Sequence, residues 1–330
     1  MRPALSVLLL TTLIGAGQGL FLALVTVQLY ALFALVPVPD PAFYRIGTFL
    51  APVLLAGGLL ASFFHLGRPE RAWRAATCWR TSWLAREVIL LPMVTGVLLL
   101  YALGHALRWH SPWIVLPSGA GLDATALLGV LGTLLTFALF VCTAMIYACL
   151  PFLREWHSWL TVANYTLLGA ASGFTLAAAL AAVASPSLAP FLIGWAIVIT
   201  LLGLASRAAT LVRNARLQPK STLQTALGVK HPRIVQLSQG AMGGSFNTRE
   251  FFHGRTHATL RTMRWAFLAL AFAAPLVLLA LALAGAGAPS LPLVLPAAAV
   301  AFQFSGLLAE RWYFFAEARH PQNLYYQAVA

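Results

Sequence analysis

Residues 63–87, FFHLGRPERAWRAATCWRTSWLARE, carry the ionisable groups whose types and spacing best suit chemistry. His65 and Glu87 flank this stretch, and an imidazole changes its charge near neutral pH. Such a pair suits the oxidation of a lipid-soluble quinol. His65 would accept a proton from a ring hydroxyl, and Glu87 would relay that proton towards water.

Three further side chains complete this candidate site. Arg68 and Arg86 would hold the deprotonated ring oxygen, and Trp83 would stack on the ring. Plainer roles stay open, because His65 also suits a helix end and Glu87 also suits a pair with an arginine. The other arginines of the stretch are typical of a positively charged loop at a membrane surface. The combination favours chemistry, since ionisable groups at membrane depth are costly and tend to mark proton or substrate paths.

The elements that position these residues are predicted to be membrane-spanning helices. The chain has 330 residues, of which 60% are hydrophobic and only 9% are charged. The mean hydropathy of +0.83 indicates an all-α integral membrane protein. Eight apolar runs are long enough to span: 5–36, 43–66, 83–107, 124–151, 159–184, 188–212, 264–286 and 290–315.

The positive charges fall almost entirely on one side of this eight-helix bundle. With eight spans, every Lys and Arg except Arg45 and Arg108 lies on the side of the two termini. The positive-inside rule therefore predicts that the N- and C-termini are cytoplasmic. This asymmetry also accounts for the net charge of +13 without a nucleic-acid partner.

The connection over residues 213–263 is the one sizeable extramembrane segment. It is basic, with Glu250 as its single acid. Its composition is poor in apolar pattern, so the segment is not expected to bury a core of its own. Two interpretations remain open for it: a surface for anionic lipid, or a docking platform for a soluble partner.

The composition argues against a resident redox centre or metal. The cysteines are Cys78, Cys142 and Cys149, without a CxxC spacing, so no iron–sulfur cluster or structural zinc is expected. Cys142 and Cys149 are predicted to be buried on one helix face. All eight histidines fall at helix ends or in loops, which disfavours a haem held between facing spans. Electrons must then pass to a partner chain.

Small and polar residues predict how the spans pack. Gly15 and Gly19 form a GxxxG motif in the first span, and Gly169 and Gly173 form another in the fifth. Such motifs let two backbones approach closely. Gln18 and Gln28, both in the first span, are expected to bond across helices.

Several segments resemble one known family. FFHLGRPERAW followed by TSWLAREVI is similar to the signature region of the dimethyl sulfoxide reductase membrane-anchor subunits. The opening PALSVLLLTTLIGAGQG, the central MIYACLPFLREWHSW…NYTLLG and the closing LLAERWYFFAEARHPQNLYY resemble that family too. The His-Leu-Gly-x-Pro-x-x-Ala core with its downstream glutamate is the most specific of these signals.

The resemblance implies an eight-helix subunit that oxidises menaquinol in anaerobic respiration and anchors two partners. These partners are a four-cluster ferredoxin-like iron–sulfur subunit and a molybdopterin catalytic subunit. The family's histidine implicated in menaquinol binding matches His65, and its glutamate matches Glu87. The sequence departs from the family at Arg68, where a small residue is common, and in the long basic connection.

Three alternatives stay open. A quinone-reactive subunit of the polysulfide or nitrite reductase type shares the eight-span plan and differs in the direction of electron flow. A transporter predicts broken helices and charges at the membrane midplane, whereas the charges here lie near span ends. A scaffold without redox chemistry predicts that His65 and Glu87 are dispensable.

Overall fold

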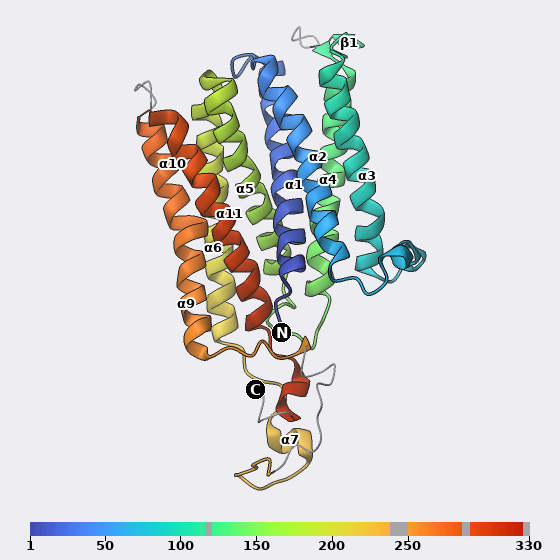
Figure 1. Ribbon diagram of the computed structural model, residues 1–330, viewed down its shortest axis with the longest axis vertical. Coiled ribbons are helices and arrows are strands. Elements are labelled where there is room, and N and C mark those ends of the chain that lie inside the picture. Colours follow the sequence, from blue (N-terminus) through green and yellow to red (C-terminus); the bar gives the residue numbers. More distant parts are fainter. Residues whose placement is uncertain (116–120, 238–249, 286–290, 326–330) are drawn as a thin grey trace.

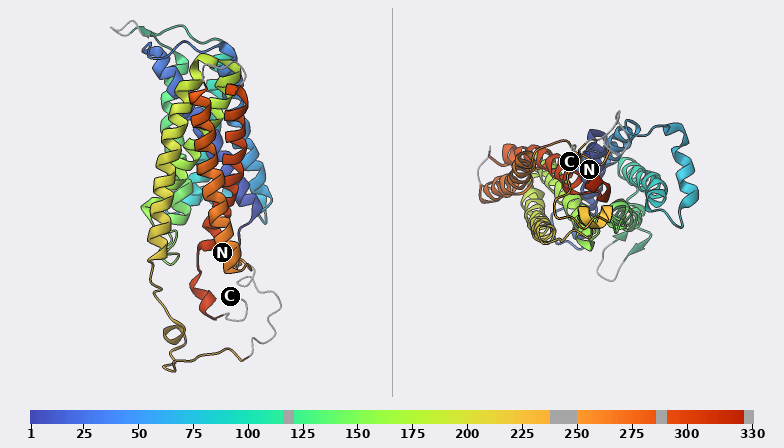
Figure 2. Two further views of the ribbon diagram at one scale, coloured as in Figure 1. Left: turned by 90° about the vertical axis from the view of Figure 1, so that its left-hand side faces the viewer. Right: turned by 90° about the horizontal axis from the view of Figure 1, so that it is seen from below.

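The computed structural model describes residues 1–115, 121–237, 250–285 and 291–325, except for the side chains of 291–293. Long helices form one elongated bundle (Figure 1, Figure 2). They are α1 (Leu5–Leu32), α2 (Pro41–Phe63), α3 (Trp83–Ala106), α4 (Ala124–Ala148), α5 (Trp159–Ala184), α6 (Ala189–Ala215), α9 (His257–Leu268), α10 (Ala274–Ala284) and α11 (Leu291–Glu317).

Seven helical segments in the described part of the chain are long and apolar enough to cross a membrane. They are α1 to α5, α6 together with the short turn that precedes it, and the continuous segment from α9 to α10. α11 lies along the same bundle, at the place of the expected eighth span (Figure 1). The all-α membrane architecture is confirmed, while the count of eight and the cytoplasmic termini stay predictions.

Short elements connect these helices. They are the 3-10 helices η1 (Pro69–Cys78), η2 (Pro186–Leu188) and η4 (Pro321–Tyr325), the antiparallel strands β1 (Ile114–Val115) and β2 (Gly121–Leu122), and helix α7 (Leu223–Leu227). A π-helical turn, η3 (Ala269–Ala273), joins α9 to α10.

Helix α1 lies at the centre of the bundle and contacts α2, α4, α5 and α11 (Figure 1). Its glycines Gly15 and Gly19 face Gly169 and Gly173 of α5, and a Cβ added at Gly173 would collide with the backbone of Gly19. The two predicted GxxxG motifs thus belong to one helix crossing. Without side chains at this crossing, van der Waals contact between the backbones holds α1 against α5.

The two glutamines of α1 bond across helices, as expected. Gln18 is buried, and its Nε2 donates to the carbonyl of Thr136 in α4 at 3.2 Å. The Gln28 Nε2 donates to Thr125 Oγ1 at 2.6 Å, and the Tyr101 hydroxyl donates to Gln28 Oε1 at 2.8 Å. These bonds link α1 to α3 and α4.

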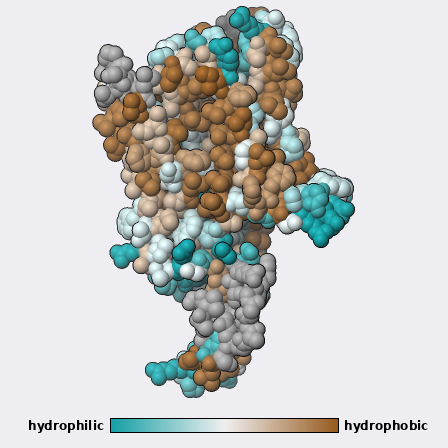
Figure 3. All heavy atoms as spheres, viewed as in Figure 1, coloured by the Kyte–Doolittle hydropathy of each residue, from teal (hydrophilic) through white to brown (hydrophobic). Residues whose placement is uncertain are grey.

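Two extramembrane segments differ from the sequence expectation. The connection 63–87 contains the 3-10 helix η1, which projects sideways from the bundle and is hydrophilic (Figure 1, Figure 3). The basic connection is shorter than 213–263, because α6 continues to Ala215 and α9 begins at His257. Thr256 stabilises that early start, since its hydroxyl accepts from the Thr259 N–H at 3.3 Å.

The two cysteines of α4 differ in exposure. Cys142 is buried, as expected, but the prediction that Cys149 is buried was wrong. Cys149 is the C-cap residue of α4, where the chain leaves the bundle.

Candidate functional site

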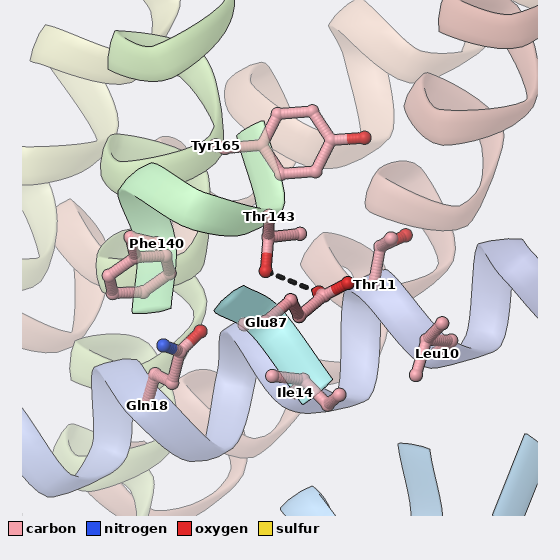
Figure 4. A pocket seen from close by; sticks show the side chains of 9 residues that line it. Leu10, Thr11, Ile14, Gln18, Glu87, Phe140, Thr143 and Tyr165 are labelled. Atoms are coloured by element: carbon pink, nitrogen blue, oxygen red, sulfur yellow. Dashed lines mark hydrogen bonds between the residues drawn. The ribbon is translucent and has the colours of Figure 1, made fainter. Parts of the chain in front are cut away.

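Glu87 lies in the second turn of α3 and reaches into the bundle. Ser82 caps this helix, because its hydroxyl accepts from the Ala85 N–H at 3.3 Å, as the sequence predicted. The cap fixes where α3 begins and thereby places Glu87 about one turn inside the helix end. Thr143 of α4 donates its hydroxyl to Glu87 Oε1 at 2.5 Å (Figure 4).

A narrow cavity surrounds this carboxylate. Four helices line it, with Thr11 and Gln18 from α1, Glu87 from α3, Thr143 from α4 and Tyr165 from α5 among the lining residues (Figure 4). The cavity has a volume of about 10 Å³. That space suits one water molecule, and it is too small for a quinone ring. Glu87 therefore faces a space the size of one water molecule, with polar groups from α1, α4 and α5 around it.

Arg86 and Trp83 lie in the first turn of α3, next to the loop. The Arg86 guanidinium is 4.1 Å from the centre of the Trp83 ring. Its Nε donates to the carbonyl of Trp79 and one terminal nitrogen donates to the carbonyl of Arg80, each at 2.9 Å. Arg86 therefore ties the end of the 63–87 connection to α3, and its other N–H donors make no hydrogen bond within the described part of the chain.

His65 and Arg68 occupy the exposed turn that follows α2. Partial burial of the imidazole lowers the pKa of His65, which favours the neutral ring. Neither residue lines the cavity at Glu87, and no described hydrogen bond joins His65 to Glu87. Of the five predicted residues, only Glu87 therefore lines the cavity. Trp83 and Arg86 lie beside it at the start of α3, and His65 and Arg68 lie on the exposed turn after α2.

A buried charge cluster lies next to the cavity, and its link from Arg207 to Glu310 was not predicted. Arg207 of α6 and Glu310 of α11 are both 0% exposed, and Arg207 Nε lies 2.8 Å from Glu310 Oε1. A terminal nitrogen of Arg311 lies 3.4 Å from the other oxygen of Glu310. The sequence signal for this cluster was Arg207, which stands in the apolar segment LASRAAT. From the sequence alone, Arg207 was only one of the positive charges assigned to the cytoplasmic side.

Tyr165 connects this charge cluster to the cavity. Its ring lines the cavity on one side, and the Arg311 guanidinium lies 3.7 Å from the ring centre. Tyr165 and its neighbour Asn164 are buried, and Asn164 Nδ2 donates to Thr210 Oγ1 of α6 at 2.8 Å. The polar groups of α1, α3, α4, α5, α6 and α11 therefore form one layer near the same end of the bundle.

Similarity to known proteins extends over nearly the whole chain. The model of the family described as DMSO reductase anchor subunit (DmsC) matches residues 2–295. A sulfite dehydrogenase subunit of Allochromatium vinosum, the one designated C, is 57% identical over 330 residues, which cover all of this chain and all of that protein. The chain therefore belongs to the DMSO reductase anchor subunit family, as the membrane anchor subunit of a molybdopterin oxidoreductase-type complex.

Proposed function

We propose that this anchor subunit transfers electrons between a membrane quinone and an iron–sulfur partner, in a complex whose molybdopterin subunit oxidises sulfite. The full-length likeness to a sulfite dehydrogenase subunit supports this substrate class. Sulfite and water give sulfate, two electrons and two protons. The quinone takes up two electrons and two protons and becomes quinol, so the overall reaction balances.

The observation that carries this proposal is the Glu87 carboxylate inside the bundle, held by Thr143 at 2.5 Å beside a cavity for one water. A carboxylate at this depth is costly unless it has a role. Quinone reduction in a bilayer needs protons delivered from water, and a carboxylate with an adjacent water is suited to relay them. The cavity does not admit the ring, so the ring binds outside it.

The outer face of the first turn of α3 is the proposed place for the quinone ring. Arg86 offers N–H donors there, and Trp83 offers the face of its ring opposite the Arg86 guanidinium. His65 and Arg68, on the neighbouring exposed turn, complete the predicted quinone site. In this arrangement His65 exchanges a proton with the ring oxygen, and Glu87 exchanges protons with the interior water.

Oxidation of menaquinol with electrons passing outward to a reductase is the second candidate, favoured by the family's description as an anchor of DMSO reductase. The two functions use the same residues in opposite directions. In both, the partners are a four-cluster iron–sulfur subunit and a molybdopterin subunit. The proposed location is the inner membrane of a bacterium, with both termini in the cytoplasm.

The test is purification of the complex from its own membranes in mild detergent, followed by mass spectrometry and two assays. One assay measures sulfite-dependent reduction of a quinone analogue, and the other measures quinol-dependent reduction of dimethyl sulfoxide. Activity in the first assay alone supports the sulfite function. Activity in the second alone supports the reductase, and a chain that purifies without redox partners contradicts both.

Glu87→Gln and Glu70→Gln form a matched pair for the site. Glu70 is an exposed acid of η1 whose carboxylate lies 3.8 Å from Arg71. We expect Glu87→Gln to slow quinone-linked turnover by at least about 100-fold, and to leave sulfite oxidation with ferricyanide as the acceptor unchanged. Glu70→Gln should behave as the unchanged chain in both assays. Equal quinone-linked rates in the two variants would contradict the assignment of Glu87 and favour a scaffold.

A further inference from the structure

A second and larger pocket lies at the opposite end of the bundle from Glu87, where α3 ends and α4 begins. Its volume is about 520 Å³, which is in the range of pockets that hold small organic ligands. It shares no residue with the Glu87 cavity, and the proposed quinone chemistry does not use it.

One wall of this pocket is apolar and lies on the outer flank of the bundle. Leu100 of α3 and Leu127 and Leu128 of α4 form this wall. Leu100 is 47% exposed and Leu127 is 59% exposed, so the pocket opens sideways. In a chain that spans a membrane, that opening faces the hydrocarbon of the bilayer near its surface.

The other wall is polar and carries one positive charge. Arg108, Ser111 and two indoles, Trp109 and Trp113, form it. Tryptophans at this level are typical of the membrane–water interface. An apolar wall towards the bilayer and a cationic wall towards water match an amphiphile with an anionic head group.

Arg108 has no acidic partner in the described part of the chain, because the nearby carboxylate is already engaged. Asp123 Oδ1 accepts from the Thr125 hydroxyl at 2.8 Å and from the Ala126 N–H at 2.7 Å. Its Oδ2 lies 3.1 Å from His110 Nδ1. The charge of Arg108 is therefore available to a ligand.

Arg108 adopts a backbone conformation that is unfavourable for a residue with a Cβ. Its φ is 56°, in the left-handed region, directly after the end of α3. Glycine is the default at this position, because a residue with a Cβ strains the backbone there. The chain nevertheless places an arginine there, and its side chain lines the pocket.

Hydrogen bonds and packing hold the backbone of the polar wall. The Trp109 indole packs against Gly104, where an added Cβ would lie 3.3 Å from the ring. The backbone N–H of Trp109 donates to the Gly104 carbonyl at 2.9 Å. The Trp113 N–H donates to the carbonyl of Leu122 at 2.8 Å, next to the pairing of β1 with β2. These bonds fix the main chain that carries both indoles.

We propose that this pocket binds one phospholipid with an anionic head group. The lipid phosphate lies at Arg108 and Ser111, the glycerol lies between the two indoles, and an acyl chain follows Leu100 and Leu127. A free phosphate ion would leave most of the 520 Å³ and the whole apolar wall unused. A lipid fills both parts.

Native mass spectrometry of the purified complex in detergent tests this assignment. The probes are phosphatidylglycerol, phosphatidylcholine with the same acyl chains, and inorganic phosphate. The variants are Arg108→Gly and Arg108→Asn, which both tolerate a left-handed backbone. Arg45→Ala is the matched control, since Arg45 is the other arginine at this end, is exposed and does not line the pocket.

We expect the unchanged complex and Arg45→Ala to retain one phosphatidylglycerol, and both Arg108 variants to retain it at least about tenfold less. Phosphatidylcholine should be retained more weakly, and millimolar phosphate should not displace the lipid. Equal retention of phosphatidylglycerol in the Arg108 variants overturns the proposal. If phosphatidylcholine is retained as well as phosphatidylglycerol, the pocket does not select an anionic head group. If phosphate displaces the lipid, the pocket is an ion site and the lipid proposal is wrong.

A thermal melt separates loss of binding from loss of folding. Without added lipid, Arg108→Gly should melt at the same temperature as the unchanged complex or higher, because glycine removes the backbone strain. Added phosphatidylglycerol should raise the melting temperature of the unchanged complex and of Arg45→Ala, and not that of Arg108→Gly. If the lipid raises the melting temperature of Arg108→Gly by the same amount as that of the unchanged complex, the proposed site is wrong.

Discussion

Replacing Glu310 by glutamine is expected to destabilise the bundle more than any other single carboxylate-to-amide change in the described spans. Glutamine keeps the size and shape of the side chain, so the change removes the charge and little else. Glu310 is fully buried between two arginines, with one oxygen 2.8 Å from Arg207 and the other 3.4 Å from Arg311. Glu310→Gln leaves two buried guanidinium groups without the carboxylate they share.

The distances set the size of the effect. At an effective dielectric constant of about 20, unit charges 2.8 Å apart attract by about 6 kcal/mol. Much of this attraction only offsets the cost of taking both charges out of water. Breaking a buried pair from one side therefore costs about 3–5 kcal/mol in measured stability. The control Glu317→Gln removes a carboxylate of the same helix that accepts from the Tyr313 hydroxyl at 3.5 Å and is also attracted by Arg207, without a direct ion pair in the described part of the chain. It should therefore cost less than Glu310→Gln.

Unfolding in dodecyl maltoside micelles with increasing dodecyl sulfate measures these free energies. Labelling of the buried Cys142 thiol reports unfolding, in a background where the exposed Cys78 and Cys149 are replaced by serine. The double variant Arg207→Met, Glu310→Gln completes a cycle, and a coupling of at least about 1 kcal/mol is expected. A cost for Glu310→Gln no larger than that for Glu317→Gln would refute the reasoning, as would strict additivity in the cycle.

Three further predictions concern the helix crossing, the candidate site and a helix cap. Gly173→Ala should cost about 1–3 kcal/mol in the same unfolding assay, because its methyl group meets the backbone of α1. Gly96→Ala, with nothing within 4 Å of its added Cβ, should be neutral or stabilising by up to about 1 kcal/mol, and equal effects would contradict the crossing. Thr143→Val removes the 2.5 Å bond to Glu87 and should lower the rate of quinone-linked turnover, by less than Glu87→Gln does. An unchanged rate would show that this bond does not serve the relay. Burial disfavours the ionised carboxylate of Asp123, but its three hydrogen bonds together lower the pKa below the ordinary value. The ionised Asp123 therefore stabilises the folded protein above the ordinary aspartate pKa of about 4, and this stabilisation is lost as the pH falls through the pKa of Asp123 in the folded state. Asp123→Asn should therefore flatten the acid side of the melting-temperature profile, and an unchanged profile would contradict this.

The features that could be predicted from the sequence depend on neighbouring residues or on simple periodicity. Long apolar runs indicated the spans, and Ser82 before an apolar run indicated the start of α3. Gly19 and Gly173 were recognised as packing residues, since small residues four apart leave a flat helix surface. That the two motifs face each other required knowing which helices are neighbours, which no local pattern reveals.

The unpredicted features depend on residues far apart in the chain. Arg207 and Glu310 belong to different helices, so neither sequence neighbourhood shows that the other charge compensates it. The narrowness of the cavity at Glu87 has the same origin, because side chains from four helices set it. The assignment of His65 to the quinone site stays a prediction, which the matched activity assays address.

The central position of α1 has a consequence for the order in which the bundle assembles. α1 is the first of these spans to leave the ribosome, and its partner in the glycine crossing, α5, follows only after α2, α3 and α4. Until then the Gly15–Gly19 face of α1 remains against lipid or an insertion factor, with α2 as the earliest neighbour it contacts. The core closes only when α5 arrives, so a ribosome stalled before α5 leaves a chain whose central helix has no partner at its glycine face. Such chains are the ones that membrane quality control has to recognise.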